Sequence, residues 1–344
     1  MKSEDGHGNG DLSARLRSLR PFPHEVVALT FVAAGIAVLE RLPVTYPRDA
    51  LLRVWGAPIA AVCSLALVIA VSAAILRRRH GLAGPTLGTE VVLLARTGIV
   101  LVPTLSVHFL LKGSIHLINP LVWDRQLDRL DTAIHLGVSP SAFLTTLLHN
   151  AMLLHFVDLV YSVLYFFVLV TYTAVLLGLL PTRRKLAFIA GFVLVWIFGM
   201  ALYVAVPTWG PAFVFPEQFA DVLPFMPNTT TVQGVLFEEI GALVRNPTGF
   251  RVLRFGCVAA FPSLHVAVIS LLKLASRTVS RRWFRANVAL LMVMVVGSVV
   301  TGYHYLVDSY AGVLLAGVSW WAGTAIYDRP GPQAPEIDTV APTV

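Results

Sequence analysis

The sequence has few charged residues and almost no cysteine. Aspartate, glutamate, lysine and arginine make up only 13% of the 344 residues, and two residues are cysteine. Cys63 and Cys257 lie far apart and form neither a CxxC nor a metal-ligand pattern, so we assign them no role. What the chain has instead is apolar sequence, with 56% hydrophobic residues and a mean hydropathy of +0.75. This composition is typical of a membrane protein and not of a soluble globular domain.

Long apolar stretches predict an all-α, polytopic membrane helix bundle. About 20 apolar residues in a helix cross the hydrocarbon core of a bilayer, and backbone groups inside lipid must pair within the protein, which favours helices. Eight spans are predicted, at about residues 25–42, 54–76, 91–111, 151–180, 186–206, 258–275, 286–306 and 309–327. Residues 1–24 lack an apolar signal region, so we expect a cytoplasmic tail there.

Basic residues occur in short clusters between the apolar stretches. Although the net charge is +7, this distribution does not suit nucleic-acid binding. The clusters are Arg77–Arg79, Arg183–Lys185 and Arg277 with Arg281, Arg282 and Arg285. With eight spans, the positive-inside rule places all of them on the cytoplasmic side. The opposite side then carries two long connections, 112–150 and 207–257. In the first, we expect a short interfacial helix with an apolar face of Leu127, Leu130, Ile134 and Leu136.

Two short motifs near the C-terminal end contain the candidate catalytic and binding residues. In AAFPSLHVAV (259–268), Pro262, Ser263 and His265 stand at the predicted start of a span, where free backbone N–H groups favour an anion. In TGYHYLVDSYAG (301–312), His304 and Asp308 are spaced i and i+4 and share a face if a helix continues through them. The carboxylate would fix the imidazole tautomer and leave the other ring nitrogen free to attack.

Other interpretations of these residues are open. An interfacial histidine is often only a hydrogen-bonding residue, and two histidines with one aspartate could bind zinc, although no HExxH pattern supports a metal site. A transporter or scaffold without catalysis would also retain apolar helices, but we find no internal repeat. The two histidines are expected at one level of the membrane, and this convergence favours a catalytic site.

The strings FPSLH and GYHYLVD resemble the second and third signature motifs of the type 2 phosphatidic acid phosphatase superfamily of membrane proteins. The leucine of PSLH, the spacing of the histidines and VPTWGP at 206–211 resemble the inositol phosphorylceramide synthase branch, the aureobasidin target. The resemblance covers residues 90–327 and implies a six-helix catalytic core. It leaves two N-terminal transmembrane helices within 25–89 and a disordered tail at 328–344.

The resemblance also implies roles for individual residues. His304 would be the phosphohistidine nucleophile, Asp308 would orient it, and His265 would protonate the leaving oxygen. Ser263 and Tyr303 would contact substrate, and no metal or other cofactor would be needed. The superfamily's first motif, with its lysine and arginine, is not present in clean form. The candidates for the missing cation are Arg251, Arg254 and Lys112, each of which could instead only reach towards the headgroups. Arg96, and His155 with Asp158, are expected as buried polar pairs.

The predicted function is a lipid phosphotransferase that transfers a phosphoryl headgroup such as inositol phosphate. The expected partners are a membrane lipid substrate and a lipid or polyol acceptor, with no nucleic acid. If water replaces the acceptor, the enzyme is a phosphatase acting on a phosphatidate or polyprenyl phosphate. We expect an integral protein of the plasma membrane with its site facing outward.

Overall fold

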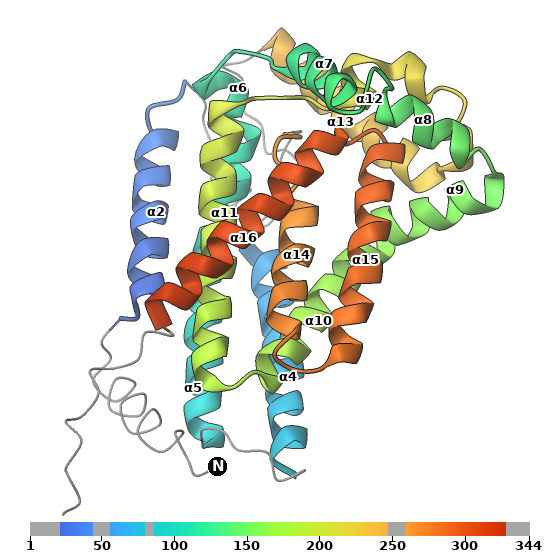
Figure 1. Ribbon diagram of the computed structural model, residues 1–344. Helices are drawn as coiled ribbons and strands as arrows, with labels where there is room; N and C mark the ends of the chain where they lie inside the picture. The colour runs from blue at the N-terminus through green and yellow to red at the C-terminus, as the bar shows by residue number, and fades with distance from the viewer. Residues whose placement is uncertain (1–20, 44–55, 80–85, 247–258, 328–344) are drawn as a thin grey trace, which may run out of the picture.

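The computed structural model describes residues 21–43, 56–79, 86–246 and 259–327, and these fold into a helical bundle without β-strands (Figure 1). Helices occupy all eight apolar stretches, which confirms the predicted all-α fold. They are α2 (Pro23–Leu39), α4 (Ala57–Arg79), α5 (Leu87–Gly113), α9 (Ala151–Asp158) continued by a π-helical segment (Leu159–Leu164) and α10 (Tyr165–Leu179), α11 (Thr182–Ala205), α14 (Leu264–Ser276), α15 (Arg281–Val300) and α16 (Leu306–Tyr327).

In the described part of the chain, five helical stretches are long and apolar enough to cross a membrane: α4, α5, the continuous stretch Ala151–Leu179, α11 and α15. Two further helices, α2 and α14, are apolar but shorter. The short α14 lies at the centre of the bundle, where it packs against α11, α15 and α16. Almost all of its side chains are buried, so this helix faces protein and not lipid.

Glycine allows α16 to pack closely on its neighbours. A Cβ atom at Gly323 would lie 2.3 Å from the carbonyl oxygen of Ala187 on α11, and one at Gly312 would lie 2.5 Å from the carbonyl oxygen of Ser263. Small residues at helix interfaces let membrane helices come into backbone contact. Gly312 therefore brings the start of α16 against the start of α14, which is where the two histidine motifs lie.

Short helices cover one end of the bundle (Figure 1). They are α6 (Ile115–Ile118), α7 (Asp124–Ile134), α8 (Pro140–Leu147), α12 (Pro211–Val214), two 3₁₀ turns (Pro216–Phe219 and Leu223–Phe225) and α13 (Pro227–Arg245). The interfacial helix expected in the first connection is α7, but Leu136 lies beyond its end at a φ of 58°. Much of the second long connection is also helical, because α12, both 3₁₀ turns and α13 lie within it.

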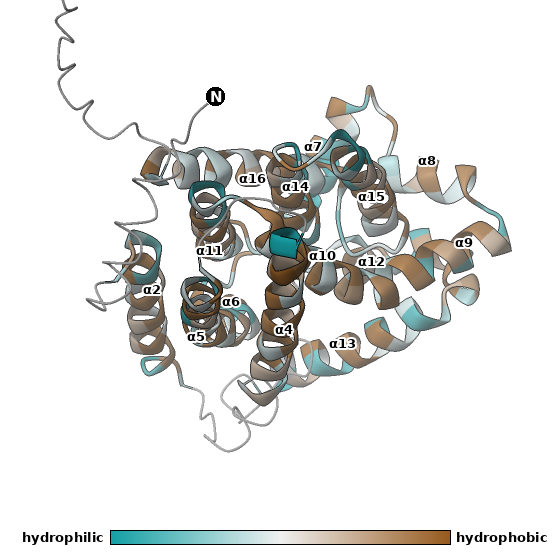
Figure 2. Ribbon diagram, turned by 90° about the horizontal axis from the view of Figure 1, so that it is seen from below, coloured by the Kyte–Doolittle hydropathy of each residue, from teal (hydrophilic) through white to brown (hydrophobic). Residues whose placement is uncertain are grey.

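The opposite end of the bundle, seen from below in Figure 2, carries the basic clusters. Arg77 at the end of α4 and Lys185 at the start of α11 are buried and form ion pairs with the buried Glu90 of α5. These two residues are therefore structural as well as being part of the predicted topology signal. All three clusters do lie at one end, as the positive-inside interpretation requires, and the membrane side that this end faces stays a prediction.

The polar pairs expected inside the bundle are confirmed in one case. Arg96 on α5 pairs with Glu25 on α2, with Nε 2.9 Å from Oε1. The expected pair of His155 with Asp158 is wrong, because His155 is exposed. Asp158 is buried and accepts hydrogen bonds from the backbone N–H groups of Asn228 (3.0 Å) and Thr229 (2.7 Å) at the start of α13. It attaches this covering helix to the bundle.

Replacing Glu25 tests the contribution of the pair between α2 and α5. Glu25→Ala leaves the guanidinium of Arg96 largely buried without this carboxylate. We expect a loss of about 3 kcal/mol in the free energy of unfolding, at the lower end of the range for broken buried pairs. The measurement is thermal unfolding of the purified protein in detergent. Glu40→Ala, at the exposed end of the same helix, is the control. Equal midpoints for the two variants would contradict the prediction.

Candidate active site

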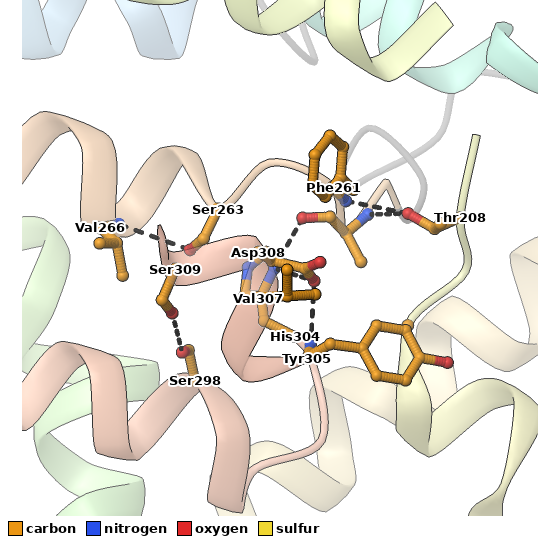
Figure 3. Close-up of polar contacts among 12 residues, drawn as sticks. Thr208, Phe261, Ser263, Val266, Ser298, His304, Tyr305, Val307, Asp308 and Ser309 are labelled. Carbon is orange, nitrogen blue, oxygen red and sulfur yellow. Dashed lines mark hydrogen bonds and ion pairs between the residues drawn. The ribbon is translucent and has the colours of Figure 1, made fainter. Parts of the chain in front are cut away.

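The two histidines predicted to converge do so. His265 lies in the first turn of α14 and His304 in the turn between α15 and α16, and their ring centroids are 5.8 Å apart. Nδ1 of His304 lies 2.8 Å from the carbonyl oxygen of Ala260 and 3.4 Å from Oδ2 of Asp308 (Figure 3). Because a carbonyl oxygen only accepts, Nδ1 carries the proton. The other nitrogen, Nε2, keeps its lone pair and can act as a nucleophile.

Asp308 reaches His304 differently from the way the sequence suggested. Helix α16 begins at Leu306, so the pair does not lie on one continuous helix but spans the turn that leads into it. Oδ2 of Asp308 also accepts a hydrogen bond from the backbone N–H of Tyr305 at 2.9 Å, which closes that turn. The backbone carbonyl of Asp308 accepts from the N–H of Ser263 at 3.0 Å. One buried residue therefore fixes both the imidazole and the start of α14.

The turn that carries His304 depends on Gly302. This residue has a φ of +73°, a conformation that side chains other than glycine rarely adopt, and a Cβ atom there would lie 2.6 Å from Cβ of Ala212. The Gly302 carbonyl accepts from the N–H of Ala212, and the N–H of His304 donates to the carbonyl of Ser298. The glycine of the motif thus lets the chain reverse tightly below α12 and aim His304 at His265.

The start of α14 differs in detail from the prediction. Ser263 is the N-cap, with its Oγ 3.5 Å from the N–H of Val266, and Pro262 precedes the cap and is not in the first turn. The side chain of Ser263, which was predicted to contact substrate, is fully buried, and its hydroxyl contacts the backbone of its own helix. The N–H groups of Leu264 and His265 have no acceptor within the described residues. These two groups are the free donors that a helix start offers to an anion.

Aromatic side chains surround His265. The hydroxyl of Tyr161 lies 3.5 Å from its Nδ1, and the ring of Tyr165 meets its ring edge-on at 4.8 Å between centroids. Tyr303, predicted to contact substrate, stacks on Tyr161 at 5.9 Å. The sequence gave no signal for Tyr161 and Tyr165, because they stand in an apolar span without a motif. Only the packing of the π-helical segment and α10 against α14 shows them.

Two carboxylates of α7 hold the loops of the site, and they were not predicted. Asp131 accepts from the N–H groups of Leu306 (2.9 Å) and Val307 (3.0 Å) at the start of α16. Asp124 accepts from Trp209 (2.9 Å) and Gly210 (2.7 Å) and from the hydroxyl of Tyr305. Burial raises the pKa of both carboxyls, and the backbone donors act against that rise. A signal existed in the sequence, since both aspartates stand in the amphipathic stretch at a spacing of two helical turns.

Of the three candidate cations, only Lys112 lies in the described part of the chain. Lys112 at the end of α5 lines the same cavity as His265, with its Nζ 5.7 Å from the ring centroid of Tyr203. Arg251, Arg254 and Cys257 lie outside the described residues. Within the described residues, no group of three or more histidine, cysteine, aspartate or glutamate side chains could hold a metal ion.

The fold and the site define a class of protein: a helical membrane protein whose buried His–Asp pair faces a second histidine beside free helix-start donors. A family model described as the PAP2 superfamily matches residues 125–322, and the chain belongs to that superfamily. It is an enzyme that acts on lipid phosphates, as a phosphatase or phosphotransferase. No curated protein and no solved structure gives a match. The matched segment contains both histidine motifs and begins after Lys112, so α2, α4 and α5 lie outside it.

Removing the carboxylate of Asp131 should slow turnover without unfolding the protein. Asp131→Ala frees the start of α16, and a small displacement of His304 is expected to lower kcat about ten- to a hundredfold, while KM changes little. The measurement is steady-state turnover of a lipid phosphate in detergent. Asp128→Ala, on the same helix, is the control. Equal kcat values for the two variants would show that Asp131 does not position the site.

The protonation state of His304 gives a second prediction. Burial lowers its pKa to about 3, with Lys112 acting in the same direction. Because the pKa lies below the ordinary value of about 6.5, the ring stays neutral throughout mildly acidic and neutral solution. NMR of histidine-labelled protein, assigned with His304→Ala, should show no titration of this ring between about pH 5 and 8. A titration centred in that range would contradict the buried geometry.

Proposed function

We propose that the protein transfers a phosphoryl headgroup, such as inositol phosphate, from one lipid to an alcohol acceptor through a phosphohistidine on His304. The observation that carries the proposal is the fixed tautomer of His304. Its Nδ1 is held by the Ala260 carbonyl and by Asp308, which leaves Nε2 as an oriented nucleophile. His265 faces this ring as the candidate acid and base.

In the first step, Nε2 of His304 attacks phosphorus. A phosphorus–nitrogen bond forms and the bond from phosphorus to the oxygen of the leaving group breaks. His265, whose protonated form the bound phosphate anion favours, gives its proton to that oxygen. The non-bridging oxygens carry negative charge, which the free N–H groups of Leu264 and His265 can stabilise at the start of α14. The ammonium group of Lys112 lines the same cavity as His265 and takes the place of the cation that the superfamily's first motif would supply.

In the second step, the hydroxyl group of the acceptor attacks the phosphohistidine. The phosphorus–nitrogen bond breaks, and neutral His265 takes the proton of the attacking hydroxyl, which returns both histidines to their starting states. If water is the acceptor, the same steps release phosphate, and the enzyme is a lipid phosphatase. The identity of the acceptor is therefore the part of the proposal that the experiment must decide.

The loop VPTWGP, which resembles a loop of the inositol phosphorylceramide synthase branch, supports the proposed transfer because it contacts the segment before the PSLH motif. The hydroxyl of Thr208 accepts from the backbone N–H groups of Ala260 (3.2 Å) and Phe261 (2.9 Å), directly before the PSLH motif (Figure 3). Gly210 lies against the backbone of Tyr303 with a φ of +96°. We infer that this loop helps to shape the part of the active site that binds the acceptor alcohol. The basic clusters lie at the far end of the bundle, which favours a site on the outer face of the plasma membrane.

Trapping the intermediate tests the proposal. Purified protein is incubated with phospholipids labelled in the headgroup phosphate, with and without inositol or a lipid alcohol, and is quenched in alkali, in which phosphohistidine survives. We expect label on His304, its transfer to the added alcohol, and loss of both in His304→Ala. His265→Ala should slow turnover about a hundredfold or more, the typical effect of a general acid.

The exposed His149 provides the matched control, since His149→Ala should behave as wild type. If His304 is labelled but phosphate is only released and none reaches the added alcohol, the enzyme is a phosphatase and the proposed transfer is wrong. Folded protein that labels no histidine with any lipid would overturn the mechanism.

A further inference from the structure

A large cavity opens from the active site into the membrane-spanning part of the bundle. Its volume is about 490 Å³, and it lies between α4, α5, α10 and α11 and the first turn of α14. These four long helices lie next to one another when the bundle is viewed from its basic end (Figure 2). Two of them, α4 and α5, lie outside the segment that matches the superfamily. This chain therefore builds one wall of the cavity from helices of its own.

Most polar groups in the lining of the cavity lie at the end near the active site: His108, Lys112, Tyr165, Tyr203 and His265. The rest of the lining is mainly apolar, with single polar groups from Thr97, Thr173 and Trp196. His108 is fully buried, and its Nε2 has no hydrogen-bond partner in the described part of the structure. The far end is formed by apolar side chains: Ala70, Leu94, Leu177 and Phe188. A ligand that matches this lining has an anionic head and an apolar tail.

The cavity is long. At about 1.5 Å per helical residue, the lining stretch of α5 from Leu94 to Lys112 is about 27 Å long, whereas half of the hydrocarbon core of a bilayer is about 15 Å. The lined part of the cavity therefore extends past the middle of a bilayer.

We propose that this cavity binds the long apolar part of the lipid phosphate, and that its depth selects substrates by chain length. The inference rests on the proposed function only in placing the phosphate at His304. The chain passes Lys112 and His108, follows α4 and α5 past the middle of the membrane, and ends against Ala70, Leu94 and Leu177. Lipid phosphates whose chains fill the cavity bury more apolar surface and bind more tightly.

Gly98 offers a way to shorten the cavity without disturbing the backbone. It lines the cavity about midway along α5, and a Cβ atom there would meet only Cβ of Cys63, at 4.0 Å. A phenylalanine at this position fills the space that the lower part of the chain would occupy. Gly88 on the same helix is exposed and has no neighbour within 4 Å of an added Cβ, so Gly88→Phe is the matched control.

The first experiment measures turnover of octyl, dodecyl and octadecyl phosphate by the wild type, Gly98→Phe and Gly88→Phe. We expect kcat/KM of the wild type and of Gly88→Phe to rise with chain length. In Gly98→Phe, octyl phosphate should be turned over as in the wild type, while octadecyl phosphate loses about tenfold or more in kcat/KM, the effect of withdrawing roughly two methylenes from apolar contact. An unchanged chain-length profile in Gly98→Phe would overturn the inference.

A second experiment reports on the cavity independently of catalysis. Octadecyl phosphate with a diazirine at the end of its chain is photocrosslinked to His304→Ala, which cannot turn it over. Labels on Ala70, Leu94 or Leu177 support the cavity even if no lipid phosphate is turned over and the proposed function fails. Labels on side chains of the outer surface, such as Ile99, which is 73% exposed, would overturn it.

Discussion

The contact between the start of α14 and the start of α16 is the constraint on which the site depends. Three interactions make it: the N–H of Ser263 donates to the carbonyl of Asp308, Nδ1 of His304 donates to the carbonyl of Ala260, and Gly312 leaves room for the carbonyl of Ser263. Each joins one motif to the other through backbone atoms. These contacts hold the two motifs together, so that the imidazole rings of His265 and His304 face one another.

The covering helices extend this constraint to the end of the bundle that they cover. Asp124 and Asp131 of α7 accept hydrogen bonds from the loop before α12 and from the start of α16, and Asp158 does the same for α13. Carboxylates satisfy backbone N–H groups that would otherwise be buried without partners. The same use of charge recurs at the basic end, where Glu90 pairs with Arg77 and Lys185. Charged residues are rare in this chain, and the buried ones join elements that are distant in sequence.

The cavity connects the chemistry of the site with the membrane. A phosphate group must remain near the polar surface, whereas the chain attached to it is soluble only in the apolar interior. The arrangement of α4 and α5 beside α10 and α11 gives each part of such a lipid a matching lining. The superfamily segment contains both histidine motifs, and the N-terminal helices α4 and α5 form much of the apolar lining of the cavity.

The sequence by itself determined the helical class and the positions of the eight helices that it predicted as spans, because membrane spans need long apolar runs. It also placed the candidate catalytic residues in two short local motifs. It did not determine how those motifs meet. Leu306, not His304, begins α16, and Ser263 caps α14. Tyr161, Tyr165, Asp124 and Asp131 entered the site only through tertiary packing, as did the cavity. Contacts between residues far apart in the chain have no local pattern, so only the folded bundle decides them.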